Sequence, residues 1–594
     1  MNERADMPDA HPGTAPPWVL RDYAVLADGE RGAVVGPDGR VVWLCAPRWH
    51  SEAVFSALVG APGHFAVRPA DRWHVWGGAY EEGTLIRVHR WVTADAVVEC
   101  RDALALPAAP DRLRLLRRMR AVRGGAPLRL ELDPRPGFGA HRMREPRLRE
   151  GLWTAAGPGL RMRLAGAAQA TWDPRDGLRG EFRLAEGEEH DLVLELSTDT
   201  GAEPVDRLDP AALWRATERE WRRAVPDCSD LVAPRDARHA YAVLRGLTSG
   251  AGGMVAAATT SLPERANAGR NYDYRFAWLR DQCYAGLAVA AHGPHELLDS
   301  AVRFTTERVL ADGDDLRPAY TVTGGPTPPE RELPLPGYPG GGNRLGNRAA
   351  RQFQLDTFGE VLQLFAAAAR HDRLDADTVR AARVAVEAVQ RRWREPDAGL
   401  WELEERWWTH SRLSVVCGLR RIAEVLPGAD GRRCAETADA VLKETRARCL
   451  HPDGYWRRAA DDDGPEAALL VPLARGCTSG DEPSAARTRA RVEERLARDG
   501  YLYRFEHDAP LGDEEGAFLL CGFHMALATH RLGDRVGAFR WFERTRAACG
   551  PPGLFAEEYD VRQRQLRGNL PQAFVHALLL ECAVRLSDGT GPLP

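Results

Sequence analysis

The spacing of apolar residues changes near Ala211 and divides the chain into two parts of different fold class. From Val19 to Leu196, short apolar runs alternate with turns rich in glycine and proline. Two such runs, 33–35 and 41–44, flank Pro37-Asp38-Gly39-Arg40, a sequence typical of a hairpin turn. Further strands are predicted at 64–68, 84–91, 97–106, 113–122, 128–132, 160–164, 181–184 and 191–196. Short strands at this density predict an antiparallel β-sandwich.

After residue 211, apolar residues recur three and four positions apart, which is the pattern of amphipathic helices. Helices are predicted near 235–249, 276–291, 294–311, 350–370, 376–393, 408–425, 432–450, 464–474, 484–498, 515–531, 534–548 and 570–586. Six pairs of helices could close into an (α/α)6 barrel, although the number of helices does not exclude another helical repeat array.

The length of 594 residues is too great for a single compact core, so at least two domains are expected. We predict a flexible N-terminal segment at 1–18, a β-sandwich domain at 19–210, a linker helix region at 211–234 and a helical barrel at 235–594.

The charge and hydropathy patterns exclude several classes of partner. The formal net charge is -5 and no basic block is present, which argues against nucleic acid as a partner. No stretch approaches the roughly 18 apolar residues that span a bilayer, so no membrane association is expected. Residues 1–18 lack the basic start and apolar run of a secretion signal.

Cysteine usage predicts a reducing environment. The 11 cysteines are scattered, and none forms a Cys-x-x-Cys pair. Several lie within apolar helical patterns, namely Cys283, Cys417, Cys521 and Cys582. Buried free thiols explain this distribution better than disulfides or zinc ligands, so we expect a cytoplasmic protein without a metal site.

Four loops within the helical part have unusual compositions, at 252–273, 312–349, 395–408 and 550–569, and loops of this length usually carry function. The first leads into the segment Asn271–Asp281, where aromatic residues lie close to Arg280 and Asp281. Aromatic rings stack on the apolar face of a sugar, while arginine and aspartate hydrogen-bond its hydroxyls. The alternative is a helix N-terminus with core aromatics and a local ion pair.

Two of the loops carry glutamates suited to acid–base chemistry. Glu402 follows Trp401 in an aromatic stretch, where desolvation would raise the pKa of a carboxyl and suit a general acid. The adjacent Glu557 and Glu558 could supply a base that activates water. The alternative for each is a solvated surface residue.

At these residues the sequence resembles glycoside hydrolase family 15, which contains glucoamylases, glucodextranases and trehalases. The motifs that carry the resemblance extend over most of the chain: Asp22–Asp28, Gly39–Arg48, Val255–Glu264, Asn271–Asp281, Glu332–Tyr338, Gly346–Asp356, Gly399–Glu402, Thr409–Ser411, Ala556–Asp560 and Gly568–Gln572. The resemblance implies a β-supersandwich followed by an (α/α)6 barrel. It also implies inverting hydrolysis of a non-reducing terminal α-glucosyl unit.

The resemblance further implies roles for individual residues. The motif Gly399–Glu402 makes Glu402 the general acid, and Ala556–Asp560 makes Glu557 the general base. The remaining roles concern the sugar: Arg280 and Asp281 hold hydroxyls, Tyr274 lies beside the reacting centre, Trp278 and Trp401 are pocket aromatics, Glu558 helps to hold water, and Arg344, Asn347 and His410 line the pocket. Trp408 is either a stacking platform or a plug at the barrel rim.

Inversion needs a water between sugar and base, so the two carboxyls should lie roughly 6.5–9.5 Å apart. The acid needs a raised pKa and the base an ordinary one, which predicts a bell-shaped pH profile. Neither a metal nor a cofactor is required.

We predict an exo-acting, glucoamylase-like α-glucosidase that releases β-glucose from small α-glucans or disaccharides. Three alternatives remain open: an α,α-trehalase, a phosphorylase on a related barrel, and a catalytically silent carbohydrate-binding or regulatory protein. The oligomeric state is not predicted.

Overall fold

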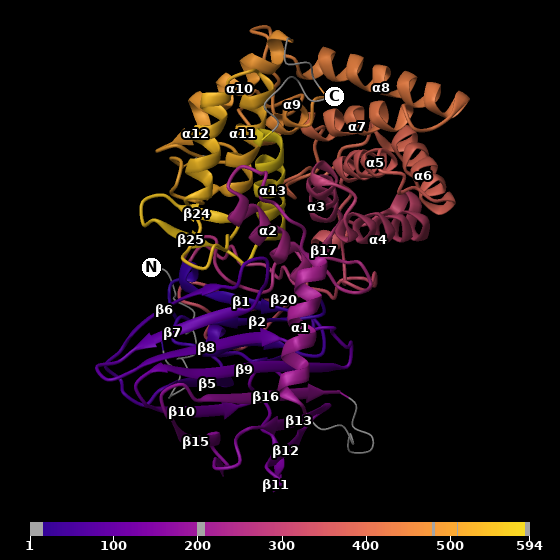
Figure 1. The fold of residues 1–594 in the computed structure, drawn as a ribbon. Coiled ribbons are helices and arrows are strands. Elements are labelled where there is room, and N and C mark those ends of the chain that lie inside the picture. Colours follow the sequence, from indigo (N-terminus) through magenta and orange to yellow (C-terminus); the bar gives the residue numbers. More distant parts are fainter. Residues whose placement is uncertain (1–15, 199–207, 478–481, 508, 588–594) are drawn as a thin grey trace.

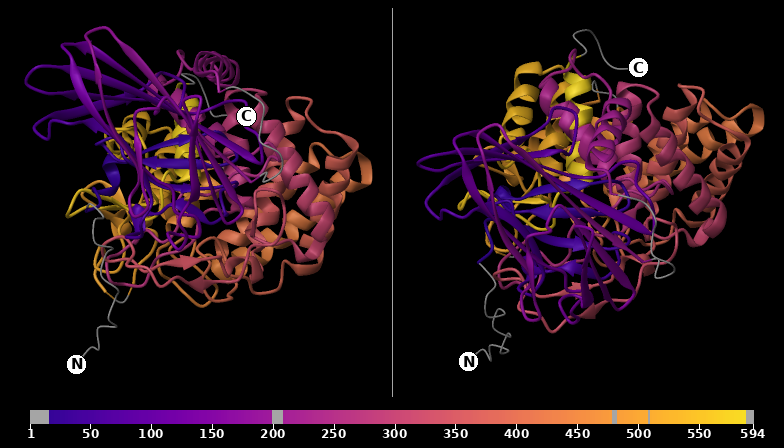
Figure 2. Two further views of the ribbon diagram at one scale, coloured as in Figure 1. Left: turned by 90° about the horizontal axis from the view of Figure 1, so that it is seen from below. Right: turned by 60° about the horizontal axis from the view of Figure 1, so that its bottom comes forward.

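The computed structural model describes residues 16–198, 208–477, 482–507 and 509–587. Residues 1–15 of the predicted flexible segment and 588–594 of the predicted barrel lie outside the described residues. The described chain consists of a β-sandwich that packs against one end of a helical barrel (Figures 1 and 2).

The β-sandwich consists of two antiparallel sheets of eight strands each. The first contains β1 (Ala24–Ala27), β2 (Gly32–Val35), β3 (Val41–Cys45), β4 (Ala53–Phe55), β5 (His64–Pro69), β10 (Ala126–Asp133), β15 (Gly177–Leu184) and β14 (Thr171–Asp173). The second contains β11 (Arg144–Arg149), β12 (Leu152–Gly157), β13 (Leu160–Ala165), β16 (Glu189–Ser197), β9 (Arg112–Arg123), β8 (Val97–Leu104), β7 (Arg87–Val92) and β6 (Val75–Tyr80). Apolar side chains alternate along strands such as β10 and form a core between the sheets.

The predicted hairpin is confirmed, because β2 pairs antiparallel with β3 and Val34 lies opposite Trp43. Gly39 in the turn has φ +78°, and a Cβ there would lie 2.6 Å from the Trp91 ring. Strands β6 and β11 were not predicted from the sequence. Nearly all their side chains are exposed, so their residues show no apolar alternation.

A long helix, α1 (Pro210–Ala224), follows the β-sandwich, and Figure 1 shows it lying along the sheets. Its Trp214 contacts the guanidinium groups of Arg101 and Arg118 from the second sheet. The predicted linker region therefore begins with a helix that packs on the sandwich.

Twelve further helices among the described residues form two concentric rings. The outer helices are α2 (Pro234–Leu247), α4 (Glu296–Asp312), α6 (Ala376–Arg392), α8 (Gly428–Cys449), α10 (Pro483–Leu496) and α12 (Arg535–Arg546). The inner helices are α3 (Leu279–His292), α5 (Leu355–Ala369), α7 (Thr409–Ala423), α9 (Val471–Ala474), α11 (Leu519–Arg531) and α13 (Ala573–Ser587). Each predicted helix is present, and the predicted (α/α)6 arrangement is confirmed.

Burial distinguishes the two rings. Inner helices such as α3 and α13 are buried along almost their whole length. Outer helices such as α6 and α10 bury one face only, as their amphipathic sequences require. The inner helices α5 and α7 approach closely at two glycines: a Cβ on Gly418 would lie 2.5 Å from the Gly359 carbonyl oxygen.

Short strands, 3-10 turns and loops occupy the connections. The short strands are β17 (Ala277–Trp278), β18 (Ala319–Tyr320), β19 (Arg331–Glu332), β20 (Arg344–Leu345), β21 (Ala497–Arg498), β22 (Tyr501–Leu502), β23 (Ala517–Phe518), β24 (Glu558–Asp560) and β25 (Gln565–Arg567). The 3-10 turns are Leu20–Asp22, Ala57–Val59, Gly313–Asp315, Ala349–Arg351 and Ala467–Leu470. Figure 1 shows β17 and β25 on the side of the barrel that faces the β-sandwich.

One cysteine prediction is wrong. Cys417 in α7 forms a disulfide with Cys477, which follows α9, whereas the other nine cysteines are free. A position on a buried helical face suits a free thiol and a disulfide equally well. The partner lies 60 residues away, so sequence spacing does not reveal the pairing.

The described residues contain no helix that is long and apolar enough to cross a membrane. They also contain no group of three or more histidine, cysteine, aspartate or glutamate side chains that could hold a metal ion.

Candidate active site

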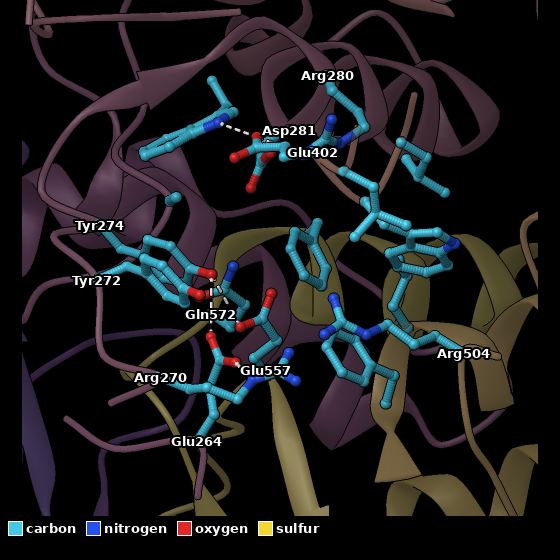
Figure 3. A pocket seen from close by; sticks show the side chains of 18 of the residues that line it. Glu264, Arg270, Tyr272, Tyr274, Arg280, Asp281, Glu402, Arg504, Glu557 and Gln572 are labelled. Carbon is cyan, nitrogen blue, oxygen red and sulfur yellow. Dashed lines mark hydrogen bonds and ion pairs between the residues drawn. The ribbon is translucent and has the colours of Figure 1, made fainter. Parts of the chain in front are cut away.

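A pocket of about 420 Å³ opens at the N-terminal ends of the inner helices (Figure 3). All six connections from an outer to the following inner helix contribute to its wall: Glu264 and Tyr274, Asn347 and Gln352, Trp401 and Glu402, Arg458, Arg504 and Phe505, and Glu557 and Gln572. The volume lies within the range of pockets that bind small molecules. Closing the ring of helices therefore brings together residues that are far apart in the sequence.

Glu402 lies on one side of this pocket. Its Oε1 accepts a hydrogen bond of 2.8 Å from Trp278 Nε1 and lies 3.5 Å from a guanidinium nitrogen of Arg280. The side chain is 26% exposed, and the Arg280 guanidinium lies beside it in addition to the predicted aromatic residues. The loop sequence is aromatic, but closure of the barrel places a guanidinium and open space beside the carboxylate.

The backbone of Glu402 adopts a left-handed conformation with φ +58°. Such a conformation costs a non-glycine residue of order 1–3 kcal/mol, and residues of this kind cluster at functional sites. The backbone strain at Glu402 therefore supports a functional role for this residue independently of sequence motifs.

Glu557 lies in another part of the wall, and Figure 3 shows it beside Tyr274 and Glu264. The Tyr274 hydroxyl donates to Glu557 Oε2 at 3.0 Å, and the same hydroxyl lies 3.5 Å from Glu264 Oε1. Arg270 Nε donates to the other oxygen of Glu264 at 3.2 Å.

Burial and the neighbouring Glu264 carboxyl raise the pKa of Glu557 well above its ordinary value, while the Tyr274 hydroxyl lowers it. The predicted ordinary pKa of Glu557 is therefore wrong. The sequence pattern does not reveal the effect of Glu264 on this pKa, because Glu264 precedes Glu557 by almost three hundred residues.

Arg280 and Asp281 open helix α3 and both line the pocket. Arg280 donates to Gln354 Oε1 at 3.2 Å and lies beside Glu402. Burial alone would lower the pKa of Arg280, but Glu402, Asp281 and Asp356 together raise it.

Asp281 is 1% exposed and its Oδ1 has no hydrogen-bond partner. Burial raises the pKa of Asp281 to about 7, although Arg280 lowers it. A buried carboxyl oxygen without a partner is costly, so this group is poised to bond a ligand hydroxyl in the pocket.

Tyr274, Trp278, Asn347 and Trp401 also line the pocket, whereas four predicted residues do not. Arg344 forms an ion pair with Glu330 at 3.8 Å. Trp408 is buried and donates to the Glu404 carbonyl at 3.2 Å, so it acts as a plug and offers no stacking platform. Glu558 accepts from the Gly516 amide at 2.7 Å.

His410 is the fourth of these residues. It is 1% exposed within the first turn of α7, and burial lowers its pKa to about 3. Both ring nitrogens lack hydrogen-bond partners. It lies behind the pocket wall, as part of the barrel interior.

The pocket contains residues to which the sequence analysis gave no role: Glu264, Arg270, Tyr272, Arg348, Gln352, Arg458, Arg504, Phe505, His507, Phe518 and Gln572. Glu264 and Gln572 belong to recognised motifs, so a signal existed for them. Arg458 and Arg504 come from the connections before α9 and α11. Neither connection is among the four loops that were predicted to carry function.

The chain is similar to several known proteins. The family model of glycosyl hydrolases family 15 matches residues 239–584, and a trehalase-like N-terminal domain matches residues 13–209. The trehalase of Mycobacterium tuberculosis is 30% identical over 96% of this chain and 89% of its own length. The trehalase of Mycolicibacterium smegmatis is 29% identical over 96% of this chain and 91% of its own. The isomaltose glucohydrolase of Kribbella flavida is 29% identical over 58% of this chain and 83% of its own.

Among solved structures, a bacterial glucoamylase complexed with acarbose is similar to the whole chain. The TM-score is 0.68 at 13% identity, and the alignment covers 97% of both chains. At this identity the likeness establishes the shared fold of a β-sandwich and a helical barrel. Together with the family match over the barrel, it shows that this chain belongs to glycosyl hydrolases family 15 and is a glycoside hydrolase of the inverting type.

Proposed function

We propose that this protein is an α,α-trehalase that hydrolyses trehalose with inversion at one anomeric carbon. The observation that carries the proposal is the pocket of about 420 Å³ with the two motif carboxyls, Glu402 and Glu557, in its wall. Support for trehalose comes from relatives named trehalase that match both the β-sandwich and the barrel. These names favour trehalase over the glucoamylase-like activity expected from sequence alone.

In the proposed reaction Glu402 donates a proton to the glycosidic oxygen as the C1–O bond breaks. Glu557 removes a proton from water, whose oxygen bonds to C1 from the opposite face. One glucose therefore leaves as the β-anomer, while the other keeps its α-configuration. Inversion needs a water between the base and the sugar. The predicted separation of roughly 6.5–9.5 Å between the Glu402 and Glu557 carboxyls therefore follows from the proposed mechanism, and it stays a prediction.

Polar side chains in the wall of the pocket suit a disaccharide, because both of its sugar rings carry hydroxyls. Arg280 and Asp281 would hold the glucose that is attacked. Arg348, Arg458 and Arg504 line the same pocket and offer N–H donors to the hydroxyls of the second glucose.

Measuring kcat/KM for trehalose, maltose, isomaltose and maltotetraose tests the substrate. We expect trehalose to exceed the others by at least about 100-fold, because buried donors left without hydroxyl partners penalise the wrong sugar. A preference for isomaltose would instead support an isomaltose-cleaving α-glucosidase, the second candidate function. The isomaltose glucohydrolase of Kribbella flavida suggests this candidate. The Glu402→Gln variant, purified in the same way, measures contaminating glucosidase activity.

The same assays separate the remaining alternatives. A phosphorylase would need phosphate and would form glucose 1-phosphate, whereas a hydrolase turns over in phosphate-free buffer. Binding of trehalose without any turnover would favour a catalytically silent carbohydrate-binding protein. A cytoplasmic location stays a prediction, supported by nine free cysteines and opposed by the Cys417–Cys477 disulfide.

A further inference from the structure

Glu515 is a buried carboxyl that lies behind the wall of the catalytic pocket. It precedes β23 in the connection that leads to α11, is 1% exposed and does not itself line the pocket. Its Oε2 lies close to three basic side chains that do line the pocket, namely Arg504, Arg270 and His507. The proposed reaction gives Glu515 no role, so its role has to follow from the groups that it holds.

The contacts of Glu515 with Arg504 are the shortest of the three. Arg504 Nε donates to Glu515 Oε2 at 2.7 Å, and Arg504 Nη2 lies 2.7 Å from the same oxygen. Arg270 Nη2 and His507 Nε2 lie 3.4 Å and 3.1 Å from it. Arg270 has a second carboxylate partner in Glu264, whereas Arg504 has no other among the residues that the structure describes. Glu515 is thus the carboxylate that fixes Arg504.

Aromatic rings surround the guanidinium of Arg504. Its central carbon lies 4.4 Å from the centre of the Phe518 ring, 4.9 Å from that of Phe505 and 5.8 Å from that of Trp401. Such rings attract a cation but bond no particular N–H group, whereas a carboxylate oxygen bonds chosen nitrogens. Glu515 therefore determines which edge of the guanidinium faces the pocket. Arg504 Nη1 makes no hydrogen bond within the described part of the chain and can donate to a ligand.

The position of Arg504 relates it to the second sugar of a disaccharide. Figure 3 shows Arg504 across the pocket from Tyr272 and Tyr274. Trp401, one of the rings near its guanidinium, directly precedes the proposed acid Glu402. This acid protonates the oxygen that joins the two sugars, so a donor beside its loop is placed to reach the sugar on the far side of that oxygen.

Charge compensation offers a purely structural reason for Glu515. Buried basic groups need an anion, and losing it costs stability whatever the ligand. On that reading, removing Glu515 would disturb the whole site, and substrates with one or two sugar rings would suffer alike. A role through Arg504 makes a different prediction, because only substrates with a second ring would suffer.

We propose that Glu515 is a positioning residue that holds Arg504 toward the second sugar ring and so favours disaccharides over glucosyl compounds that lack this ring. The proposal rests on the proposed function, because it needs a substrate with two sugars. A guanidinium that is fixed before binding loses less conformational freedom when the sugar arrives, so the hydrogen bond contributes more to affinity.

Kinetics of Glu515→Ala on trehalose and on α-glucosyl fluoride test this proposal. Hydrolysis of the fluoride breaks the C1–F bond and forms a C1–O bond to water; fluoride leaves, Glu557 takes the proton, and no second ring is present. We expect KM for trehalose to rise by about 10–100-fold with a smaller change in kcat, as for the loss of one hydrogen bond from a charged donor. For the fluoride, kcat/KM should stay within about threefold of the unaltered enzyme.

Two further variants make the test specific. Glu515→Gln keeps an oxygen that can accept from Arg504 Nε, so KM for trehalose should rise less than in Glu515→Ala. This variant also serves if Glu515→Ala does not fold. Glu506→Ala is the matched control, because Glu506 lies in the same connection, bonds Arg495 at 2.9 Å and 2.8 Å, and does not line the pocket. It should keep the KM of the unaltered enzyme for both substrates.

Equal losses on trehalose and on the fluoride in the Glu515 variants would overturn the proposal in favour of charge compensation. An unchanged KM for trehalose in both variants would overturn it as well. If the unaltered enzyme cleaves isomaltose or maltose in place of trehalose, the proposed function fails. The same comparison, made between that disaccharide and the fluoride, then still decides the role of Glu515.

Discussion

At the scale of single residues, Glu402 and Glu557 occupy different electrostatic surroundings. Glu402 is partly exposed and faces the guanidinium of Arg280, whereas Glu557 is 7% exposed and faces Glu264 and Tyr274. The proposed acid thus lies beside a cation, and the proposed base lies beside another carboxyl. The surroundings of Glu557 lead to a specific pH dependence.

The first prediction concerns the proposed catalytic pair. Glu402→Gln and Glu557→Gln should each lower kcat by about 10²–10⁴-fold, because each removes a group that transfers a proton in the transition state. Steady-state kinetics on trehalose measure the loss, and circular dichroism checks the fold. Glu405→Gln is the control, since Glu405 is exposed in the same loop and does not line the pocket. Near-normal turnover in either variant removes that residue from its role.

The second prediction concerns Glu264 as a residue that sets the pKa of the base. Glu557 must be ionised to act, so kcat/KM rises with pH through its pKa. Glu264→Gln removes a charge that raises this pKa, and the acid limb should move to lower pH. Tyr274→Phe removes a hydrogen bond that lowers the pKa, and the limb should move to higher pH. A shift of both variants in the same direction contradicts the assignment of Glu557 as the base.

Sequence motifs led to the predictions for Arg280, Asp281, Glu402 and Glu557, because the residues of each motif lie next to one another in the sequence. They did not predict Arg458, Arg504 or His507, which reach the pocket only once the last connections of the barrel close the ring. Arg344 and Glu558 lie in the predicted loops, but their side chains bond neighbouring groups away from the pocket.

At the scale of helices and strands, the barrel depends on the close approach of α5 and α7. A Cβ at Gly418 would lie 2.5 Å from the Gly359 carbonyl oxygen and 2.9 Å from the Leu362 Cβ. Backbone atoms cannot rotate aside, so the two helices must separate to accept a methyl group.

Gly418→Ala should therefore destabilise the protein by about 1–3 kcal/mol through overpacking. Chemical denaturation measures the change in the free energy of unfolding. Gly77→Ala is the control: Gly77 lies in the exposed strand β6, and a Cβ there meets nothing within 4 Å. Equal stability of the two variants would show that α5 and α7 have room to adjust.

Helices were easier to predict than strands for a physical reason. Each barrel helix must bury at least one face, so its apolar residues repeat at the helical period. Exposed strands such as β6 and β11 bury almost nothing and leave no such pattern. The disulfide between α7 and the segment after α9 was missed because pairing depends on which helices become neighbours.

At the scale of the whole molecule, the β-sandwich supports the loop that carries Tyr274. Arg275 is 2% exposed, and its guanidinium donates to Asp273 Oδ1 at 2.8 Å and to the Ser51 carbonyl oxygen at 2.9 Å. Apolar residues of both domains form one continuous core. The apolar patterns of the sequence predict both domains, but they do not predict this joint core.

Replacing Arg275 should therefore affect both stability and catalysis. Arg275→Gln leaves Asp273 buried without its cation, which costs about 3–5 kcal/mol, and it loosens the support of Tyr274. We expect a lower Tm and a lower kcat. The double variant Asp273→Asn with Arg275→Gln should recover part of the lost Tm, because it removes the unpaired charge. No recovery in the double variant would assign the loss to packing alone.

The most direct test of the account is proton NMR of the purified enzyme with trehalose, following the anomeric signals before mutarotation. We predict that glucose appears from the start as equal amounts of α- and β-anomers, since one ring is inverted and the other keeps its configuration. This signal should vanish in Glu402→Gln. Release of α-glucose alone would contradict inversion, and absence of glucose from trehalose would contradict the proposed substrate.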